Sequence, residues 1–288
     1  MKKSMLVVAL ATAFALPAQA ADAPAAPEAK SPHTITGNLT LASSYRFRGI
    51  DQTFGQPAIQ GGIDYSHESG FYLGNWNSNV SSGAGYAEGN IEMDFYGGWK
   101  GSFGDFGIDV GVLEYYYPGS TAKPLRFTNA KHPNSSASGT VNNTEVYVGA
   151  SWKFLSLKYS YALSDYFDLP HSDGSSYLDL SANYDLGDGW GINGHIGHFY
   201  ASDYKYATGG SRNIDYTDWK IGVTKDISGW VFGLAYVGTN ANGSCSKLEF
   251  YCFVNSLSWD SAGNTAQFGH KDKDAGRGIA VLSVTKTF

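Results

Sequence analysis

Apolar and polar side chains alternate with a period of two over most of the chain. In the first such stretch, Ile35, Leu39, Leu41, Tyr45 and Phe47 share one face, and polar side chains share the other. Alternation of this kind is typical of β-strands that turn one face towards an apolar environment. We expect about twelve strands of this type. They span residues 34 to 47, 57 to 66, 71 to 80, 90 to 100, 106 to 117, 144 to 154, 156 to 167, 176 to 186, 190 to 200, 215 to 225, 230 to 239 and 277 to 288.

The connections between these strands alternate between short and long. The short turns span residues 67 to 70, 101 to 105, 154 to 156, 187 to 189 and 226 to 229. The long polar segments span residues 49 to 56, 81 to 89, 119 to 143, 170 to 175, 201 to 214 and 240 to 276. Short turns on one side and long loops on the other are typical of outer-membrane barrels. The predicted fold class is all-β, a transmembrane antiparallel up-and-down β-barrel of about 12 strands with short periplasmic turns and long extracellular loops.

Aromatic side chains are sorted by the length of the neighbouring connection. Trp99, Trp152, Trp190 and Trp230 each lie beside a short turn. Because Trp and Tyr prefer the membrane interface, these residues predict a periplasmic girdle. A second girdle towards the long loops is predicted from a set of tyrosines, namely Tyr45, Tyr115, Tyr117, Tyr200 and Tyr236. A soluble β-sandwich with an aromatic core is the alternative, but it gives no reason for this sorting.

The last strand ends on an aromatic residue, Phe288, which shares one face with Ala280, Leu282 and Val284. Bacterial outer-membrane barrels resemble one another in this ending, which the barrel insertion machinery reads. Lys286 interrupts the apolar face, but close to the interface its ammonium group can snorkel to water.

The amino terminus has the pattern of a secretory signal peptide, predicted at residues 1 to 20. Lys2 and Lys3 precede an apolar run that ends in the small-residue pattern of residues 18 to 20. We expect a flexible segment at residues 21 to 32 and the barrel at residues 33 to 288. Without Lys2 and Lys3, 18 of the 20 basic side chains remain against 26 acidic ones, so the formal net charge falls from −6 to −8. This balance argues against nucleic acid as a partner, because phosphate binding needs a basic surface.

The two cysteines, Cys245 and Cys252, lie close together in a chain predicted to be exported. Oxidising compartments favour pairing, so we expect a disulfide at a loop tip. Metal binding is the alternative, although no further Cys or His pair with ligand spacing lies nearby.

If the apolar face of each strand meets lipid, the other face lines the lumen and follows from parity. The predicted pore-lining residues are Arg46, Arg48, Asp64, Asn75, Asn77, Glu92, Asp94, Asp109, Glu145, Lys158, Asp179, Asn183, Asn193, His195, Asp218 and Lys220. Acids outnumber bases in this set, which favours a weak cation preference. The alternative is that the charges pair across a narrow lumen and fill it. Arg46 and Arg48 are the candidates for a constriction, or else they pair with Asp64 or Glu92.

Two places depart from this pattern. Glu114 has lipid parity, which indicates either a β-bulge before Tyr115 or a position above the membrane. Val231, Ala235, Ile279 and Val281 have lumen parity although they are apolar. Packing by an inward-folded loop 240 to 276 explains them, and an apolar solute path is the alternative.

Residues 36 to 80 carry the most specific resemblance to a known family. The motif Tyr45-Arg46-Phe47-Arg48-Gly49-Ile50 is followed by Gln52-Thr53, by residues 57 to 62 and by residues 68 to 80. This segment resembles the TorF family of outer-membrane porins, and weaker similarity extends to the closing residues 284 to 288. Asp51, Asn75 and Asn77 depart from the small or hydroxylated residues associated with those places. The resemblance implies the barrel fold and an outer-membrane location.

Residue types with catalytic chemistry occur without forming a recognisable site. His171, Ser172 and Asp173 are neighbours in sequence, whereas members of a catalytic triad meet through tertiary geometry, so a turn is the simpler interpretation. Asp272 and Asp274 lack the spaced ligand set of a calcium loop. We therefore expect no catalytic site, no metal and no cofactor.

The predicted function is an outer-membrane porin-like channel for passive diffusion of small hydrophilic solutes or ions. The alternative is a structural or adhesive barrel with a plugged lumen that acts through its extracellular loops, because the fold alone does not decide function. The expected partners are outer-membrane lipid, the barrel insertion machinery and small solutes.

Overall fold

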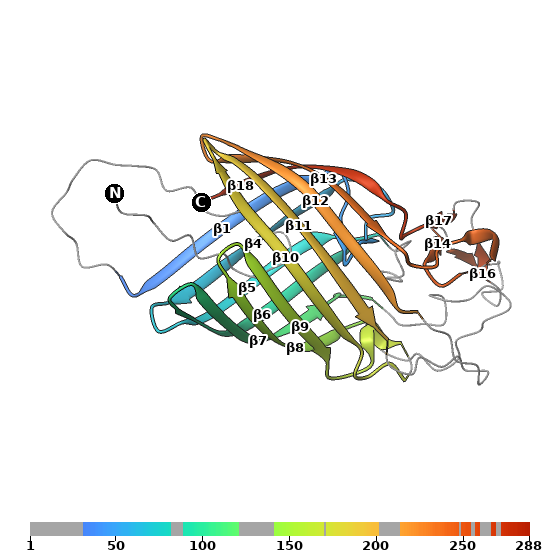
Figure 1. Cartoon of the computed structure of the whole chain (residues 1–288). Coiled ribbons are helices and arrows are strands. Elements are labelled where there is room, and N and C mark those ends of the chain that lie inside the picture. The colour runs from blue at the N-terminus through green and yellow to red at the C-terminus, as the bar shows by residue number, and fades with distance from the viewer. Residues whose placement is uncertain are drawn as a thin grey trace.

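The computed structural model describes residues 31–81, 89–120, 141–169, 171–201, 214–247, 249–254, 257–259, 266–268 and 272–288. Twelve long strands close into one barrel (Figure 1). They are β1 (His33–Ala42), β4 (Ala58–His67), β5 (Phe71–Asn79), β6 (Ile91–Phe103), β7 (Phe106–Tyr116), β8 (Asn143–Trp152), β9 (Leu155–Ala162), β10 (Ser176–Gly187), β11 (Trp190–Tyr200), β12 (Tyr216–Ile227), β13 (Trp230–Thr239) and β18 (Ile279–Thr287). The predicted signal peptide lies outside the described residues. Nowhere in these residues is a helix long and apolar enough to cross a bilayer.

Each barrel strand pairs antiparallel with its neighbours along the chain, and β1 pairs with β18 to close the ring. At this seam Leu39 lies opposite Lys286 and Leu41 lies opposite Val284. The backbone of Phe288 continues the ladder, since its N–H donates to Gly37 O at 2.9 Å and its carbonyl accepts from Gly37 N at 2.7 Å. The predicted up-and-down barrel of about twelve strands is confirmed.

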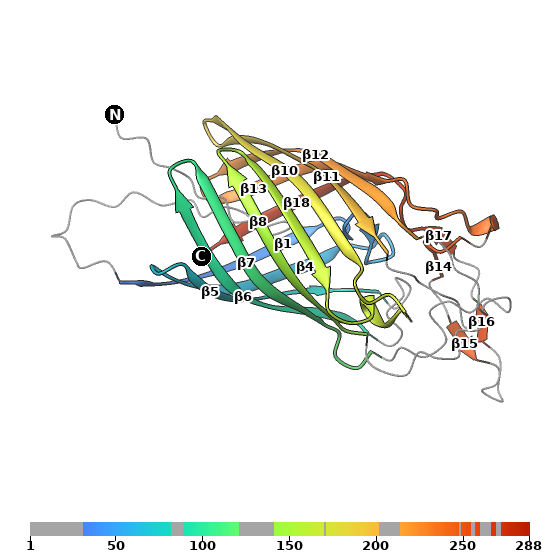
Figure 2. The same cartoon turned by 60° about the horizontal axis from the view of Figure 1, so that its bottom comes forward.

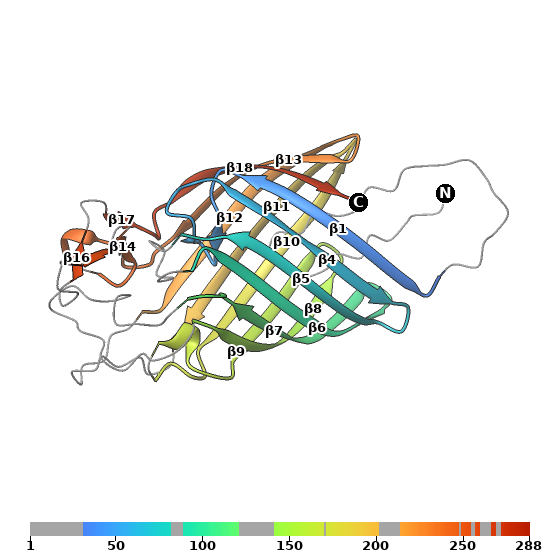
Figure 3. The same ribbon diagram turned by 180° about the vertical axis from the view of Figure 1, so that it is seen from behind.

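The short turns, the start of β1 and the end of β18 lie at one end of the molecule, called here the short-turn end (Figures 1 and 3). Two of these turns have both central residues at positive φ, namely Asp188 and Gly189 (53° and 75°) and Ser228 and Gly229 (54° and 77°). This is the type I′ geometry, whose twist matches that of the flanking strands. Local turn chemistry therefore fixes the register of these hairpins.

The outer surface of the barrel is a belt of exposed apolar side chains. Ile35, Ile63 and Leu73 have exposed fractions of 71%, 62% and 64%. A soluble monomer does not expose a continuous surface of this kind, whereas a transmembrane barrel presents it to lipid. The strand periodicity in the sequence has the same origin.

Two predicted strands end earlier than their sequence pattern indicates. The first ends at Ala42, which lies opposite Ala58 at the beginning of β4. Beyond this pair no further residue of β4 is available for pairing, and the chain turns inward. The strand predicted at residues 156 to 167 ends at Ala162, and the 3₁₀ turn η3 (Tyr166–Asp168) follows.

The final long loop forms a small lobe beyond the opposite end of the barrel, called the long-loop end (Figures 1 and 2). Its elements are η4 (Cys245–Lys247), β14 (Cys252–Val254), β15 (Leu257–Trp259), β16 (Ala266–Phe268) and β17 (Asp272–Asp274). β14 pairs with β17, and β15 pairs with β16. These strands lie outside the lumen, so the predicted inward folding of loop 240 to 276 does not describe them.

Candidate functional site

Residues 43 to 57, called the plug, leave the end of β1 and form a small hairpin of β2 (Arg46–Phe47) and β3 (Ile50–Asp51). The hairpin is fixed by local bonds. Gln52 N donates to Tyr45 O at 2.9 Å, and the carboxylate of Asp51 accepts from the backbone N–H groups of Thr53 and Gly55, each at 3.1 Å. An Asp side chain that accepts from the backbone two and four residues later stabilises a turn without any help from the barrel.

The plug contributes to an aromatic cluster that fills the long-loop end of the lumen. Phe47 contacts Tyr115 and Phe167 edge-on, with ring centroids 5.3 and 5.8 Å apart. The buried cluster consists of Phe47, Ile50, Val80, Tyr115, Tyr117, Val141, Ala162, Tyr166, Phe167, Leu169, Tyr177, Phe199, Ile214, Tyr216, Tyr251 and Ala275. Side chains from five barrel strands and six connections, the plug among them, thus meet in one dry layer across the bore.

Arg48 is the charged centre of this layer. Its guanidinium forms an ion pair with Glu145 at 2.7 Å, donates to the Tyr166 hydroxyl at 3.1 Å and lies over the ring of Tyr177, 4.3 Å from the centroid. Burial on its own lowers the pKa of Arg48, but the carboxylate of Glu145 raises it, so that the pKa lies well above its ordinary value. The guanidinium is therefore always charged, and its buried position depends on the ion pair with Glu145.

Arg46 lies at the rim of the plug and is held mainly by the final loop. Its guanidinium donates to Ala275 O at 2.9 Å and to Arg277 O at 3.2 Å, and it lies 3.6 Å from the carboxylate of Asp51. Burial lowers the pKa of Arg46. The predicted pairing of Arg46 and Arg48 with Asp64 or Glu92 is wrong, because both arginines sit on the folded plug and not on a straight β1.

Below the plug, Glu92 and Asp94 project from β6 into the lumen. The carboxylate of Glu92 accepts hydrogen bonds from the hydroxyl groups of Tyr45 at 2.6 Å and Tyr117 at 2.7 Å. Asp94 is 8% exposed, and its Oδ1 has no hydrogen-bond partner among the residues described. Tyr45 therefore connects the plug to the acidic side of the lumen.

A second polar cluster lies on the opposite wall. His195 Nδ1 lies 2.8 Å from Asp179 Oδ2, and His195 Nε2 lies 3.3 Å from Asp218 Oδ2. The hydroxyl of Tyr177 donates to Asp218 Oδ1 at 2.8 Å. Because Tyr177 also supports Arg48, this cluster is continuous with the dry layer above it.

Nearer the short-turn end, tyrosine hydroxyl groups bind the lumen acids. Tyr96 donates to Asp64 at 2.5 Å, and Tyr72 donates to Asp109 at 2.6 Å. The hydroxyl groups of Tyr72 and Tyr147 are also hydrogen-bonded to each other. These side chains come from five neighbouring strands, β4 to β8, so they form a band along the wall.

The tyrosine rings of this band rest on glycines of neighbouring strands. A Cβ atom built on Gly74 would overlap the ring of Tyr96, and one built on Gly111 would overlap Tyr147. The rings therefore cover the backbone where side chains are missing and lie against the wall.

Most of the remaining predicted pore-lining residues face the lumen as well. Lys158 lies over the ring of Tyr147, with its Nζ 4.0 Å from the centroid. Lys220 lies opposite His195, and Asn183 lies opposite Asn193, in the register of β10 to β12. Parity therefore places these residues on the inner wall together with Asp64, Glu92, Asp94, Asp109, Glu145, Asp179 and Asp218.

Asn75 and Asn77 are an error of the sequence prediction, because they face outward. In β5 the inward positions are taken by Trp76 and Ser78, which are 7% and 1% exposed. Asn77 Nδ2 donates to Asn75 Oδ1 at 2.6 Å, and Asn75 Nδ2 donates to the carbonyl of Asp94 at 3.0 Å. The sequence rule placed polar residues inside, but Trp76 packs against Tyr45 in the dry layer and decides the register.

The predicted tyrosine girdle is also corrected. Tyr45 projects inward, and Tyr115 and Tyr117 are 4% and 1% exposed in the dry layer. Tyr200 and Tyr236 do face outward, with exposed fractions of 48% and 50%. Tyrosines near the long loops lie either in the dry layer or on the outer surface, and the sequence pattern does not distinguish these two positions.

The tryptophans beside the short turns lie at the outer surface. Trp190 and Trp230 are about half exposed, and the ammonium groups of Lys225 and Lys286 lie 4.8 and 5.5 Å from their ring centroids. Trp152 is exposed in the same way, and Trp99 Nε1 donates to the carbonyl of residue 69 at 2.9 Å. Aromatic rings with polar contacts at the rim suit a membrane interface.

Glu114 lies on the outer face near the long-loop end. It pairs with Phe95 in an unbroken register between β6 and β7, so the predicted alternative of a bulge is wrong. Its carboxylate accepts a hydrogen bond from Thr144. A position near the end of the strand lets the carboxylate reach polar surroundings.

One quadrant of the lumen wall is apolar. Ala235 lies opposite Val281, and Val231 lies opposite Thr285, with Ile279 next to them on β18. These side chains are partly exposed and do not belong to the dry layer. The final loop does not pack on them through its described strands.

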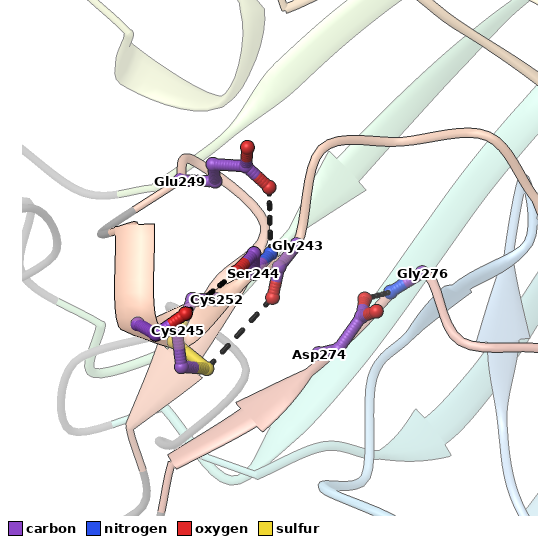
Figure 4. The surroundings of a disulfide bond; sticks show 8 residues. Gly243, Ser244, Cys245, Glu249, Cys252, Asp274 and Gly276 are labelled. Atoms are coloured by element: carbon purple, nitrogen blue, oxygen red, sulfur yellow. Dashed lines mark hydrogen bonds between the residues drawn. A yellow bond between two sulfur atoms is a disulfide. The ribbon is translucent and has the colours of Figure 1, made fainter.

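The two cysteines form a disulfide in the final loop (Figure 4). Ser244 N donates to Glu249 Oε2 at 2.7 Å beside it. Within the described residues, the only group of ligand side chains close enough for a metal ion is Cys245, Cys252 and Asp272, and its sulfur atoms are bonded to each other.

The segment His171-Ser172-Asp173 forms a turn. Ser172 N and Asp173 N both donate to Asp165 Oδ1, at 2.9 and 3.2 Å, and Ser172 Oγ donates to Leu169 O at 2.6 Å. Ser172 is fully buried. A buried hydroxyl that is bound to the backbone is not placed to attack a substrate.

A family model described as "Bacterial protein of unknown function (Gcw_chp)" matches residues 26–262. The chain belongs to this family. No curated protein matches it. Among solved structures, the NanC porin aligns with 10% identity and a TM-score of 0.46 over 88% of this chain and 98% of that one. OmpT of Vibrio cholerae aligns with 8% identity and a TM-score of 0.42, over 91% of this chain and 99% of that one. OccAB3 of Acinetobacter baumannii aligns with 9% identity and a TM-score of 0.42, over 89% of this chain and 65% of that one.

Proposed function

We propose that the protein is an outer-membrane porin-like channel for small hydrophilic solutes, closed at its extracellular end by the plug. One observation carries the proposal. Below the dry layer, the charged side chains of Asp109, Lys158 and Asp179 stay partly exposed to the lumen, and the tyrosine rings lie against the wall. Charged side chains that retain access to solvent indicate a wet bore, because a dry one would make their burial costly.

The orientation follows from the two ends of the barrel. We place the short turns and the tryptophan girdle in the periplasm, and the long loops with the disulfide lobe outside the cell. This orientation implies export, with a signal peptide removed after residue 20, and reading of Phe288 by the insertion machinery. The resemblance to the TorF porins, which includes the plug motif, supports the same proposal.

The charges left in the lumen favour cations weakly. Arg48 is paired with Glu145, so it contributes little field to the open bore. On the described inner wall, the acids of β4, β6, β7, β10 and β12 then outnumber Lys158 and Lys220. An excess of carboxylates along a bore raises the local cation concentration.

Planar-bilayer recording with two proteins tests the proposal. The wild type is compared with a plugless variant, in which residues 44 to 56 are replaced by a short Gly-Ser linker. We expect rare, small conductance steps from the wild type and frequent, larger steps from the plugless variant, with a reversal potential that shows cation preference. A Ser228→Asn variant, altered in a short turn, is the control and should match the wild type.

Absence of conductance steps from the plugless variant would refute the channel. The buried plug and the projecting disulfide lobe then favour the second candidate, a structural or adhesive barrel. In that case exchange of the final loop should abolish binding to a surface, and substitution of lumen residues such as Asp109 should not.

A further inference from the structure

The final loop reaches back over the plug through residues 272 to 277, called the latch. Lys273 Nζ forms an ion pair with Asp51 Oδ2 at 3.1 Å. The backbone of Ala275 accepts hydrogen bonds from Asp51 N at 3.0 Å and from the guanidinium of Arg46 at 2.9 Å. Both strands of the plug hairpin are therefore bound by one short segment of a loop that begins almost 190 residues later in the chain.

The latch depends on β14 for its position. Cys252 pairs with Asp274, and Phe253 pairs with Lys273. Next to this ladder, Ala275 N donates to Tyr251 O at 2.9 Å. The two residues that hold the plug, Lys273 and Ala275, are thus placed by backbone contacts to the segment that contains Cys252.

The disulfide ties this segment to η4 (Figure 4). Strands of three residues each are too short to be stable alone, and η4 buries none of its described side chains. The covalent bond therefore adds to the order that the buried side chain of Tyr251 gives this lobe, by restricting its alternative conformations.

We propose that the Cys245–Cys252 disulfide is a redox modification site that controls the plug, and this inference rests on the channel function proposed above. A thiolate attacks one sulfur, forms a mixed disulfide and releases the other cysteine as a thiolate. A second thiol then releases the remaining cysteine, so that two external thiols are oxidised to one disulfide and both cysteines are reduced. Reduction frees β14, the latch loosens, and the plug loses its bonds to Lys273 and Ala275.

The lobe also selects the class of thiol. The carboxylate of Asp272 is exposed and lies within 4.8 Å of both sulfur atoms. A negative charge at this distance repels an anionic thiolate and attracts a cationic thiol. Small thiols that carry a positive charge, such as cysteamine, should therefore reduce the bond faster than mercaptoacetate of similar size, and Asp272→Asn should narrow that difference.

Reduction weakens the closed state without removing it. The plug keeps its ion pair between Arg48 and Glu145 and its hydrogen bond between Tyr45 and Glu92. We therefore expect reduction to raise the opening frequency severalfold, to a level below that of the plugless variant.

The test records single channels before and after a reductant is added on the long-loop side of the bilayer. The opening frequency of the wild type should increase when the reductant is added. The Cys245→Ser/Cys252→Ser variant should have a high opening frequency from the start, and the reductant should not change it. The reductant should also leave the opening frequency of the plugless variant unchanged. Lys273→Ala should raise the opening frequency as reduction does, although its disulfide is intact. This variant keeps the test valid if the serine variant misfolds. Lys247→Ala, on exposed η4, is the matched control and should behave as wild type.

An unchanged wild-type record, with both cysteines shown to be reduced by thiol labelling, would overturn the latch. A silent plugless variant would instead refute the channel. In that event hydrogen exchange in detergent still tests the latch, because reduction should speed exchange in residues 43 to 57 and leave residues 190 to 200 unchanged. The latch would be overturned if reduction left the exchange rate of residues 43 to 57 unchanged.

Discussion

Replacement of Arg48 by Ala should open the channel more than any other single substitution in the plug. Arg48 is 6% exposed, and its guanidinium is bound to Glu145 at 2.7 Å and to the Tyr166 hydroxyl at 3.1 Å. Truncation leaves the carboxylate of Glu145, which is 2% exposed, without its cation. The closed state is thereby penalised twice, by the lost contacts and by the desolvated charge that remains.

The size of the effect follows from this burial. Removal of one partner of a buried ion pair costs about 3 to 5 kcal/mol. The cost applies when the plug is docked, because an undocked plug leaves Glu145 open to lumen water. Since about 1.4 kcal/mol corresponds to a factor of ten in an equilibrium constant, the ratio of open to closed states should rise by about two to three and a half orders of magnitude.

Single-channel recording measures this ratio as open probability. Adding Glu145→Gln to Arg48→Ala removes the unpaired charge and should restore part of the closure, which a double-mutant cycle quantifies. Lys225→Ala, over Trp190 at the outer surface, is the control and should leave gating unchanged. The reasoning fails if Arg48→Ala gates like the wild type, or if the second substitution opens the channel further.

The remaining predictions concern the wall and the last residue. Gly74→Val should push the ring of Tyr96 into the bore and lower the unit conductance of the plugless variant severalfold, as measured in planar bilayers. The double variant Asn75→Leu/Asn77→Leu should raise the free energy of unfolding in lipid by about 1 kcal/mol in denaturant titrations, because it removes amides from the lipid face. If the two side chains faced the lumen instead, the same substitutions would lower the free energy of unfolding. Phe288→Ala should slow assembly into outer-membrane vesicles, as followed by heat-modified migration on gels, without changing the conductance of correctly folded channels.

The segment with the strongest family resemblance has an unexpected position. Residues 45 to 53 alternate like the end of a strand, yet they form the plug. Their chemistry explains why they leave the wall. The Arg48 side chain reaches Glu145 and Tyr177 only from inside the bore, and Gly49 at a φ of 78° allows the reversal between β2 and β3.

The barrel, its strand count and most of its inner wall can be predicted from the sequence alone. Strand periodicity and turn length are local properties, and a lipid belt imposes one parity on every strand, so Asp109, Lys158 and His195 could be placed inside from sequence alone. The proximity of Cys245 and Cys252 along the chain likewise indicated a disulfide.

The closure of the bore, in contrast, depends on contacts between residues far apart in the sequence. Nothing local brings Arg48 to Glu145, nearly 100 residues later, or Asp51 to Lys273 in the final loop. Polarity failed at Asn75 and Asn77 because the packing of Trp76 against Tyr45 set the parity of that strand. Contacts of this kind depend on which strands become neighbours when the barrel closes, and a period of two along the chain contains no information about them.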